Sequence, residues 1–343
     1  MANYGGVFKV RVLITGVAGF LGSHLADRFL EDGHEVIGVD NLLGGYRSNV
    51  PVGVIFVEMD LLDLDKTNAV FSGVELVIHA ACTAYEGLSV FSPSLIVANT
   101  TQITTNVISA SVKNNVKKII YMSSMARYGT QDSVPFKEEM TPAPQDPYGI
   151  AKYASELLLK NLCDVHGLQF VILVPHNIIG SRQKYDDPYR NVASIMINRM
   201  LSGKQPIIYG TGEQRRCFSF IVDVVEPLYA ASFSIDALSK TINIGPDEEF
   251  VTINQLAQVI AEILGFELSP IYMDGRPQEV FEANCSADLA RKILSYQTKT
   301  DLRDGLVELV EWIKEQGVKP FSYHLPLEIV SEKTPKSWKD QLM

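Results

Sequence analysis

The amino-acid sequence predicts an α/β fold, in which a doubly wound parallel sheet is followed by a smaller, mixed α/β C-terminal domain. In the first half, short apolar runs alternate with longer amphipathic runs, as strands and helices do in βαβ units. The apolar runs show no polar alternation, which is typical of strands that are covered on both faces. Because each crossover helix returns the chain to the same end of the sheet, these strands are expected to be parallel.

The expected elements follow in order along the chain. Strands are predicted at residues 10–14, 35–39, 54–57, 76–79, 118–122 and 170–174, and helices at 20–30, 93–113 and 148–165. The second half is more irregular, with loop-like stretches at 180–188 and 209–216 and helices at 254–264 and 301–314. The predicted domains are a doubly wound domain over 1–175 with returns near 218–246, a cap over 176–320 and a tail over 321–343. The tail is polar and contains prolines, so it is expected either to drape over the surface or to be disordered.

Composition bounds the class of protein. The chain has 343 residues and a net charge of -10, which argues against general binding to nucleic acid or to anionic membranes. A phosphate-bearing ligand stays compatible with this charge, because a few local cations and backbone N–H groups can hold one. No apolar run is long enough to span a bilayer, and residues 1–9 do not resemble a signal peptide. Four widely spaced cysteines without a CxxC motif predict buried thiols and no metal site, and these features together favour the cytoplasm.

A glycine-rich turn at residues 15–22 joins the first strand to the first helix. Gly16 permits the sharp turn, and Gly19 lets the backbone approach a pyrophosphate whose charge the helix N-terminus meets. Gly22 allows the helix to pack closely on the strand. The alternative is a plain glycine turn, but the strand before it and the helix after it favour dinucleotide binding.

Asp40 ends the second predicted strand and is expected to select the dinucleotide. A carboxylate there can accept hydrogen bonds from both ribose hydroxyls of NAD and would repel the 2'-phosphate of NADP. No arginine follows directly, so NAD is the predicted cofactor, and the alternative for Asp40 is a solvated loop acid. Other expected cofactor contacts are Asp60 and Leu61 after the third strand, Ala80 and Ala81 after the fourth, and Asn99 in the next helix, for which a surface polar role is the alternative.

Tyr148 and Lys152 form the predicted catalytic pair. At i and i+4 of a helix they share one face, and a lysine ammonium near the phenol lowers the pKa of the tyrosine, so that the phenolate can act as a base. Pro147 suits the start of that helix. Ser124 follows the predicted strand at 118–122, at the carboxyl end where ligands bind in such sheets, and can share the hydrogen bond to a reacting oxygen. The alternative for Ser124 is a capping serine.

These residues together resemble the extended short-chain dehydrogenase/reductases, and within them the nucleotide-sugar 4-epimerases. The resemblance covers residues 10 to about 317. Its motifs are 15–22, Ser123-Ser124 with Tyr128-Gly129, 148–152, 175–177, Arg216 with Asp223, Arg276-Pro277, and 294–312. The segment 123–152 is most similar to bacterial UDP-glucose 4-epimerases.

The resemblance implies an NAD-binding Rossmann domain, a substrate-binding cap and a redox-neutral reaction. Tyr148 would remove the proton of the sugar 4-hydroxyl while hydride passes from C4 to NAD, and the transient 4-keto sugar would turn over and be reduced on its other face. Lys152 would tune Tyr148 and hold the nicotinamide ribose, and Ser124 would orient the 4-oxygen. The implied cofactor-binding residues are Gly16, Gly19, Phe20, Leu21, Gly22, Asp40, Asn41, Asp60, Leu61, Ala80, Ala81, Asn99, Tyr148, Lys152 and Pro175. The implied substrate-binding residues are Ser124, Met125, Tyr148, Asn177, Arg190, Asn191, Val192, Arg216, Arg276 and Ala283.

Two positions bear on the reaction and on the sugar. Related dehydratases and UDP-glucuronate decarboxylases carry a glutamate two residues after the catalytic Ser or Thr, where this chain has Ala126, and a methyl group cannot do acid–base work. The family position that sets the room around the sugar C2 substituent falls on Ala283, which predicts that UDP-N-acetylhexosamines are tolerated. The chain departs from the family pattern at Val174, Cys217 and Gln278, which leaves the sugar open.

The expected function is therefore NAD-dependent 4-epimerisation of a UDP-hexose such as UDP-glucose or UDP-galactose. Two alternatives stay open: another NDP-sugar oxidoreductase or epimerase of this fold, acting on a uronic acid or a heptose, and a non-catalytic NAD-binding scaffold. Net formation of NADH would favour a dehydrogenase, and a Tyr148→Phe variant with unchanged cellular function would favour the scaffold. A homodimer that pairs through helices 93–113 and 148–165 is also expected from the resemblance.

Overall fold

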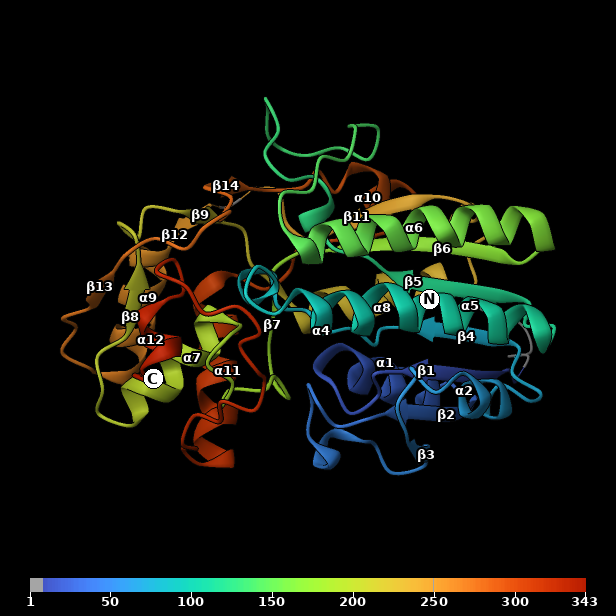
Figure 1. Ribbon diagram of the computed structural model, residues 1–343, viewed down its shortest axis with the longest axis horizontal. Helices are drawn as coiled ribbons and strands as arrows, with labels where there is room; N and C mark the ends of the chain where they lie inside the picture. The colour runs from blue at the N-terminus through green and yellow to red at the C-terminus, as the bar shows by residue number, and fades with distance from the viewer. Residues whose placement is uncertain (1–8, 249) are drawn as a thin grey trace.

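The computed structural model describes residues 9–248 and 250–343 and contains a seven-stranded parallel sheet (Figure 1). The strand order is β11-β6-β5-β4-β1-β2-β3, which reverses direction between β1 and β4. In such sheets ligands bind at the carboxyl ends of the strands beside this reversal. The strands are β1 (Arg11–Thr15), β2 (Glu35–Asp40), β3 (Ile55–Glu58), β4 (Leu76–His79), β5 (Lys118–Met122), β6 (Gln169–Pro175) and β11 (Thr241–Ile244). The predicted doubly wound fold is confirmed.

Helices cover both faces of this sheet and bury a hydrophobic core on each side. On one face lie α1 (Phe20–Glu31), α8 (Ile221–Ala231) and α10 (Asp288–Leu294). On the other lie α2 (Leu64–Val70), α5 (Ile103–Lys113) and α6 (Pro147–His166). Strands buried from both sides need apolar residues at every position, which explains why the apolar runs do not alternate.

The helix predicted at 93–113 is confirmed in its extent, but it contains a π-helical turn that the sequence analysis did not predict. The chain forms α4 (Pro93–Val97), then a π-helical turn over Ala98–Gln102, and then α5. A π turn accommodates one extra residue and turns side chains away from their α-helical positions. Asn99 and Thr100 in this turn are buried. An apolar periodicity that continues through the turn gives no sign of this insertion.

The residues after β6 build most of a second lobe beside the carboxyl edge of the sheet (Figure 1). Its helices are α7 (Val192–Leu201), α9 (Ile253–Leu264) and α11 (Leu302–Gln316), which share a core of their own. Short strands connect them: β7 (Ile178–Ile179) with β10 (Ser219–Phe220), β8 (Ile207–Tyr209) with β13 (Ile271–Met273), and β9 (Arg215–Arg216) between β12 (Val251–Thr252) and β14 (Glu282–Ala283). Among residues 9–248 and 250–343, no helix is long and apolar enough to cross a membrane.

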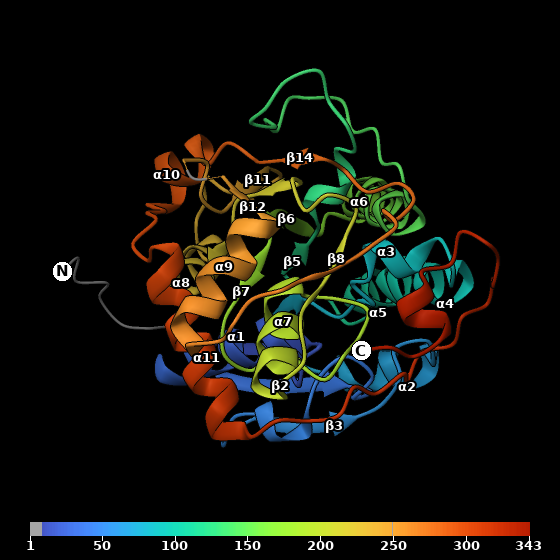
Figure 2. The ribbon, with the colours of Figure 1, turned by 90° about the vertical axis from the view of Figure 1, so that its left-hand side faces the viewer.

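The C-terminal tail is packed against the molecule. After α11, residues 321–343 cross from the second lobe to α4 and return, with α12 (Lys336–Lys339) near the end (Figure 2). Trp338 in α12 is only 2% exposed. Of the two outcomes expected for the tail, the structure shows the one in which it drapes over the surface.

Candidate active site

A cavity of about 490 Å³ lies where the carboxyl ends of the sheet strands meet the second lobe. This volume is in the range of ligand sites, which are roughly 300–1,000 Å³. Every predicted cofactor-binding residue lines it, as does every predicted substrate-binding residue except Met125 and Ala283. The fold therefore brings together residues that are more than 100 positions apart in the sequence, such as Gly16 and Arg276.

The glycine-rich turn fits a dinucleotide because side chains at its glycine positions would clash with neighbouring backbone atoms. Gly16 has a φ of 73°, and a Cβ there would lie 2.9 Å from the Cα of Ala81. A Cβ on Gly22 would lie 2.2 Å from the carbonyl oxygen of Gly16, so only glycine lets α1 start this close to β1. Gly19 caps α1 without a side chain, which leaves the helix N-terminus open toward the cavity. Such an N-terminus is suited to a pyrophosphate.

Asp40 lies at the end of β2, where its carboxylate holds the two loops that border the cofactor region. It accepts hydrogen bonds from the backbone N–H groups of Ala18 (2.9 Å) and Leu42 (2.7 Å). Burial raises the pKa of Asp40, and these backbone hydrogen bonds oppose that rise. A carboxylate has about four acceptor positions, so it can also accept from ribose hydroxyls. The turn, the open helix end and Asp40 together fit NAD.

The catalytic pair lies on the first turns of α6. Asp146 caps this helix by accepting a hydrogen bond from the backbone N–H of Gly149 at 3.0 Å, and Pro147 occupies its first position. Lys152 donates a hydrogen bond to the carbonyl oxygen of Met122 at 2.7 Å, and its Nζ lies 5.9 Å from the centre of the Tyr148 ring. Since Met122 ends β5, this bond fixes the lysine against the strand that precedes Ser124.

The pKa of Tyr148 is governed by two opposing effects. Burial is the larger and raises the pKa, whereas the charge of Lys152 and a hydrogen bond with Ser124 lower it. The predicted direction of the lysine's influence is therefore right, but in the protein alone burial outweighs it. Further positive charge near the phenol, or a hydroxyl that donates a hydrogen bond to its oxygen, would lower the pKa of Tyr148 as Lys152 does.

Two arginines define the opposite end of the cavity. Arg276 pairs with Glu279 at 2.7 Å, and Arg216 lies 3.8 Å from the same carboxylate. Arg216 is held by the backbone, because it donates to the carbonyl oxygen of Val280 at 2.7 Å. The guanidinium of Arg276 lies 4.9 Å above the ring of Tyr209. Two fixed guanidinium forks of this kind are suited to clamping a diphosphate.

Arg190, Asn191, Val192 and Asn177 also line the cavity. The guanidinium of Arg190 donates to the carbonyl oxygen of Gly44 at 3.2 Å and lies 4.8 Å above the ring of Tyr85. Asn191 has a φ of 67° and precedes α7, whose N-terminus it directs toward the cavity.

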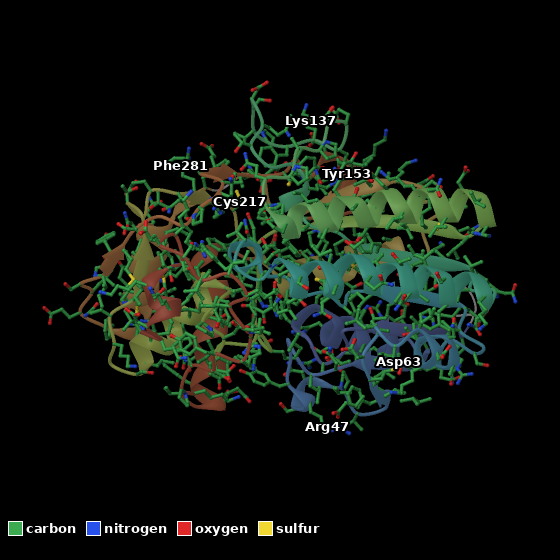
Figure 3. The ribbon with its side chains drawn as sticks, viewed as in Figure 1. Arg47, Asp63, Lys137, Tyr153, Cys217 and Phe281 are labelled. Carbon is green, nitrogen blue, oxygen red and sulfur yellow. The ribbon has the colours of Figure 1, made fainter. Side chains whose placement is uncertain are left out.

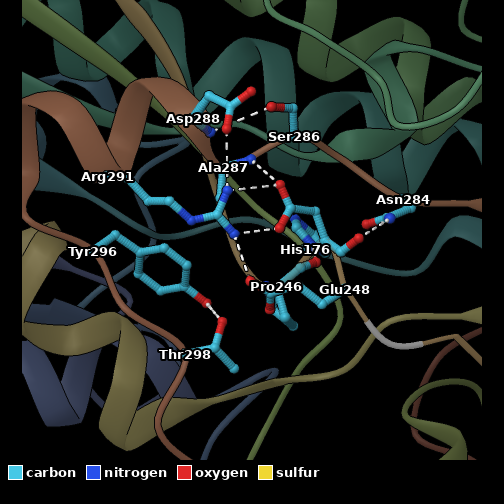
Figure 4. Close-up of polar contacts among 11 residues, drawn as sticks. His176, Pro246, Glu248, Asn284, Ser286, Ala287, Asp288, Arg291, Tyr296 and Thr298 are labelled. Carbon is cyan, nitrogen blue, oxygen red and sulfur yellow. Dashed lines mark hydrogen bonds and ion pairs between the residues drawn. The ribbon is translucent and has the colours of Figure 1, made fainter.

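Asn177 is positioned by contacts on both of its sides. Its side-chain amide donates to the carbonyl oxygen of Cys217 at 2.9 Å, and Cys217 lies near the junction of the two lobes (Figure 3). His176, directly before it, contacts the carbonyl oxygen of Pro246 at 2.9 Å (Figure 4). These contacts hold the segment after β6 against the cavity.

Two predicted substrate residues do not reach the cavity. Ala283 lies in β14 opposite Arg216 of β9, and it is buried in the core beneath that strand pair. Met125 packs against the same core. Asp223 of the Arg216 motif instead accepts backbone hydrogen bonds from Lys299 (3.0 Å) and Thr300 (2.9 Å), so it anchors a loop. A position matched by spacing alone does not reveal which way its side chain points.

Several cavity residues were missed by the sequence analysis. Glu86 keeps accessible surface that faces the cavity, but protein surrounds it; this desolvation, and then the charge of Asp146, raises its pKa to about 7, while Arg216 and Arg276 oppose the rise. Its place shortly after β4, at the carboxyl edge of the sheet, was a usable signal. Tyr209 and Trp338 also line the cavity, and nothing in the tail sequence pointed to Trp338.

The comparisons with known proteins agree with this geometry. Residues 12–245 match the model of the NAD dependent epimerase/dehydratase family. The chain belongs to this family. It is 33% identical over 310 residues to a putative UDP-glucose 4-epimerase of Methanocaldococcus jannaschii, covering 89% of this chain and 99% of that protein.

Solved structures are similar over the same extent. The UDP-glucose 4-epimerase of Thermotoga maritima, solved with UDP-glucose, has a TM-score of 0.85 at 32% identity and covers 89% of this chain and 99% of its own. The UDP-glucuronic acid 4-epimerase of Bacillus cereus, solved with UDP-glucuronic acid and NAD, has a TM-score of 0.83 at 26% identity and covers 90% of this chain and all of its own. The chain is thus an NAD-dependent enzyme of a sugar-nucleotide family, and its predicted cofactor is confirmed. Other relatives are named for decarboxylation and for 3,5-epimerisation, so membership in the family does not settle the substrate.

Proposed function

We propose that this enzyme interconverts UDP-glucose and UDP-galactose by NAD-dependent 4-epimerisation through a transient 4-keto sugar. The observation that carries the proposal is the meeting of Ser124, Tyr148 and Lys152 in one cavity, with the arginine pair Arg216 and Arg276 at its other end. A nucleotide sugar has its reacting hexose at one end of a diphosphate, and this arrangement of a proton-transfer group and anion clamps matches it.

In the proposed reaction the side chains of this chain move one proton and hold the sugar. The Tyr148 phenolate takes the proton of the 4-hydroxyl and later returns it, and Lys152 stabilises the phenolate. Ser124 holds the 4-oxygen beside Tyr148. The glycine turn, Asp40 and Lys152 would hold NAD, which would supply the hydride acceptor and donor for C4 and a positive charge that would act on Tyr148 in the same direction as Lys152. Burial of the site excludes water from the keto sugar.

Ala126 supports epimerisation over elimination or decarboxylation. It lies two residues after Ser124, and its backbone N–H donates to the Ser124 hydroxyl oxygen at 3.2 Å. A methyl group at this position offers no acid or base for a second chemical step. The proposed reaction therefore ends with the return of hydride to C4.

The proposal is tested by NMR of purified enzyme with UDP-glucose, without added reductant. We expect UDP-galactose to appear until equilibrium is reached, with no net NADH. A Tyr148→Phe protein run in parallel controls for contaminating epimerase. Absence of the galacto product with saturating UDP-glucose and bound NAD would refute the proposal.

A UDP-uronic acid is the second candidate substrate, and Arg190 favours it. This guanidinium is close enough to Tyr148 for their charges to interact, and it has donors left for a C6 carboxylate. Glu86 and Asp146 argue against it, because both carboxyl groups line the same cavity and disfavour a further negative charge there. We therefore expect UDP-glucose to have the higher kcat/KM when the two substrates are compared, and preferential turnover of UDP-glucuronate would replace the first proposal with the second.

Acceptance of UDP-GlcNAc and UDP-GalNAc is a separate part of the proposal. It was inferred from Ala283, which packs behind Arg216 rather than against the cavity. Turnover of UDP-glucose with no turnover of saturating UDP-GlcNAc would contradict it.

We also propose a homodimer that pairs through the helical segment from α4 to α5 (residues 93–113) and through α6. Val97, Ile150 and Leu157 expose 43%, 52% and 49% of their surfaces on these two adjacent helices. Light scattering should give twice the chain mass, and Leu157→Glu should reduce it to one chain. Val222→Glu, at an equally exposed position on α8, is the control that should leave the dimer intact. The cytoplasmic location stays a prediction.

A further inference from the structure

The C-terminal segment, residues 321–343, is tied to both lobes by hydrogen bonds to backbone groups. Near its start, the backbone N–H of Ser322 donates to the carbonyl oxygen of Asp186 at 2.8 Å in the second lobe. Farther on, the carboxylate of Glu328 accepts from the N–H groups of Ser94 (2.9 Å) and Leu95 (2.8 Å) at the N-terminus of α4. The segment therefore bridges the two sides of the cavity.

The last residues of the segment return to the second lobe. Arg199 donates to the carbonyl oxygen of Leu342 at 3.0 Å, and Lys204 donates to that of Met343 at 3.3 Å. The N–H of Met343 donates to the hydroxyl of Tyr323 at 3.0 Å, which closes the segment on itself. These contacts fix the position of α12.

Trp338 is the anchor of this segment. Its indole N–H donates to the carbonyl oxygen of Pro188 at 3.2 Å, and its ring meets the rings of Phe91, Tyr189 and Tyr209 edge to face at 6.0, 5.4 and 6.5 Å. Aromatic pairs at these separations stabilise one another beyond the area that they bury. The indole is thus held rigidly between residues of both lobes.

Trp338 lies at the end of the cavity that contains Arg216 and Arg276. A Cβ placed on Gly87 would lie 3.4 Å from the indole ring and 3.2 Å from the guanidinium of Arg276, so these two side chains flank the same spot. Ser337, beside Trp338, hydrogen-bonds to the hydroxyl of Tyr209 at 2.5 Å, and Tyr209 lies beneath Arg276. Trp338 and Met343 both line the cavity.

We propose that the C-terminal segment is an integral part of the substrate site, in which Ser337 and Trp338 position Tyr209 and Arg276 for the nucleoside diphosphate half of the substrate. This inference rests on the proposed function only in taking a nucleoside diphosphate as the ligand. Trp338 acts as a positioning residue, because its side chain is buried and its ring packs against Phe91, Tyr189 and Tyr209. Because the Tyr209 ring and the Arg276 guanidinium are already held in place before the ligand binds, they lose less conformational freedom on binding. This increases ligand affinity rather than turnover.

The chain has two tryptophans, which allows a direct optical test with UDP as the probe. The Trp312→Phe protein keeps Trp338 alone, and its emission should change as UDP is added. The Trp338→Phe protein keeps Trp312, which packs on Tyr185 in the second lobe, and its emission should stay constant. An unchanged Trp338 signal on saturation with UDP, measured independently by calorimetry, would overturn the proposal.

Affinity and kinetics separate positioning from folding. For Trp338→Ala we expect the Kd of UDP and the KM of the sugar nucleotide to rise about tenfold, with kcat and NAD affinity within about twofold. Trp338→Phe should recover most of the loss, and Ser337→Ala should show a smaller loss of the same kind. If Trp338→Ala does not fold, the Kd of UDP measured for Ser337→Ala and Trp338→Phe provides the test. Equal UDP affinity in these folded variants would refute the role of the segment and leave the proposed function standing, whereas a wild-type protein that does not bind UDP would refute both.

Discussion

The two ends of the cavity are built in different ways. The cofactor end uses short segments that directly follow neighbouring parallel strands, such as the glycine turn after β1 and Asp40 at the end of β2. The substrate end uses single side chains from remote segments, among them Glu86, Arg216, Arg276 and Trp338. The first end is fixed by backbone sterics, and the second by ion pairs and aromatic packing between lobes. Substitutions at the cofactor end should therefore lower NAD affinity and the free energy of unfolding. Substitutions at the substrate end should mainly raise the KM of the sugar nucleotide.

The largest expected effect lies where the two ends meet, at Tyr148. Tyr148→Phe removes the group that transfers the proton, so kcat should fall by about 10²–10⁴-fold, the usual range for general acid–base catalysis. Epimerisation rates measured by NMR check this. Tyr153→Phe on the same helix (Figure 3), a tyrosine whose ring lies 5.7 Å from the guanidinium of Arg127, should keep wild-type activity. Equal activity of Tyr148→Phe would show that another group acts as the base.

Gly22→Ala should damage only the cofactor end. Its Cβ would lie 2.2 Å from the carbonyl oxygen of Gly16, so α1 must shift. We expect a loss of about 1–3 kcal/mol in the free energy of unfolding, as for overpacked sites, and a large loss of NAD affinity. Gly33→Ala is the control, because its φ of 78° is also strained but no atom lies within 4 Å of the new Cβ. It should lower stability while leaving NAD affinity unchanged, and a matching loss of NAD binding would contradict the steric account.

Arg276→Ala should damage only the substrate end. Hydrogen bonds to charged groups contribute about 1.5–3 kcal/mol, which corresponds to a rise in the KM of the UDP-sugar of about 10- to 100-fold. NAD affinity should not change. The matched control is Arg291→Ala, which removes an arginine that pairs with Asp247, Glu248 and Asp288 outside the cavity (Figure 4). A weakened NAD site in Arg276→Ala would break the separation of the two ends.

The smallest expected effect is a pH dependence at Glu86. Its pKa of about 7 lies above the ordinary 4.5, so its negative charge appears as the pH rises through about 7. The charged carboxylate competes with the diphosphate for Arg216 and Arg276, so the KM of the UDP-sugar should rise roughly threefold across this range. Stability should change in the same direction. The folded protein disfavours the charged carboxylate, so the free energy of unfolding should fall as the pH rises from 4.5 to about 7. In Glu86→Gln the KM should stay flat over this pH range, and an unchanged slope would assign the titration to another group.

The difference between the two ends also explains what the sequence could predict. The glycine turn, Asp40 and the Tyr148–Lys152 pair were found because strand, turn and helix spacing alone places them at the carboxyl edge of the sheet. The π turn at Ala98–Gln102 was missed, because an inserted residue in a helix leaves no compositional mark.

At the substrate end, spacing was a weaker guide. Arg216 and Arg276, expected from the family resemblance, line the cavity, whereas Ala283 and Met125 pack in the core. Trp338 could not be found, because its place depends on contacts with Phe91, Pro188 and Tyr209, which only the folded chain brings together. Glu86 belongs to no motif, but its place shortly after β4 indicates that it lies near the carboxyl edge of the sheet.

The most direct test of the central claim is epimerisation of UDP-glucose that carries deuterium at C4 of the sugar. If hydride leaves C4 to bound NAD and returns to the other face, the UDP-galactose formed must keep the deuterium at C4, with no net NADH. Product that carries hydrogen from water at C4, or no product from enzyme with bound NAD, would contradict the account.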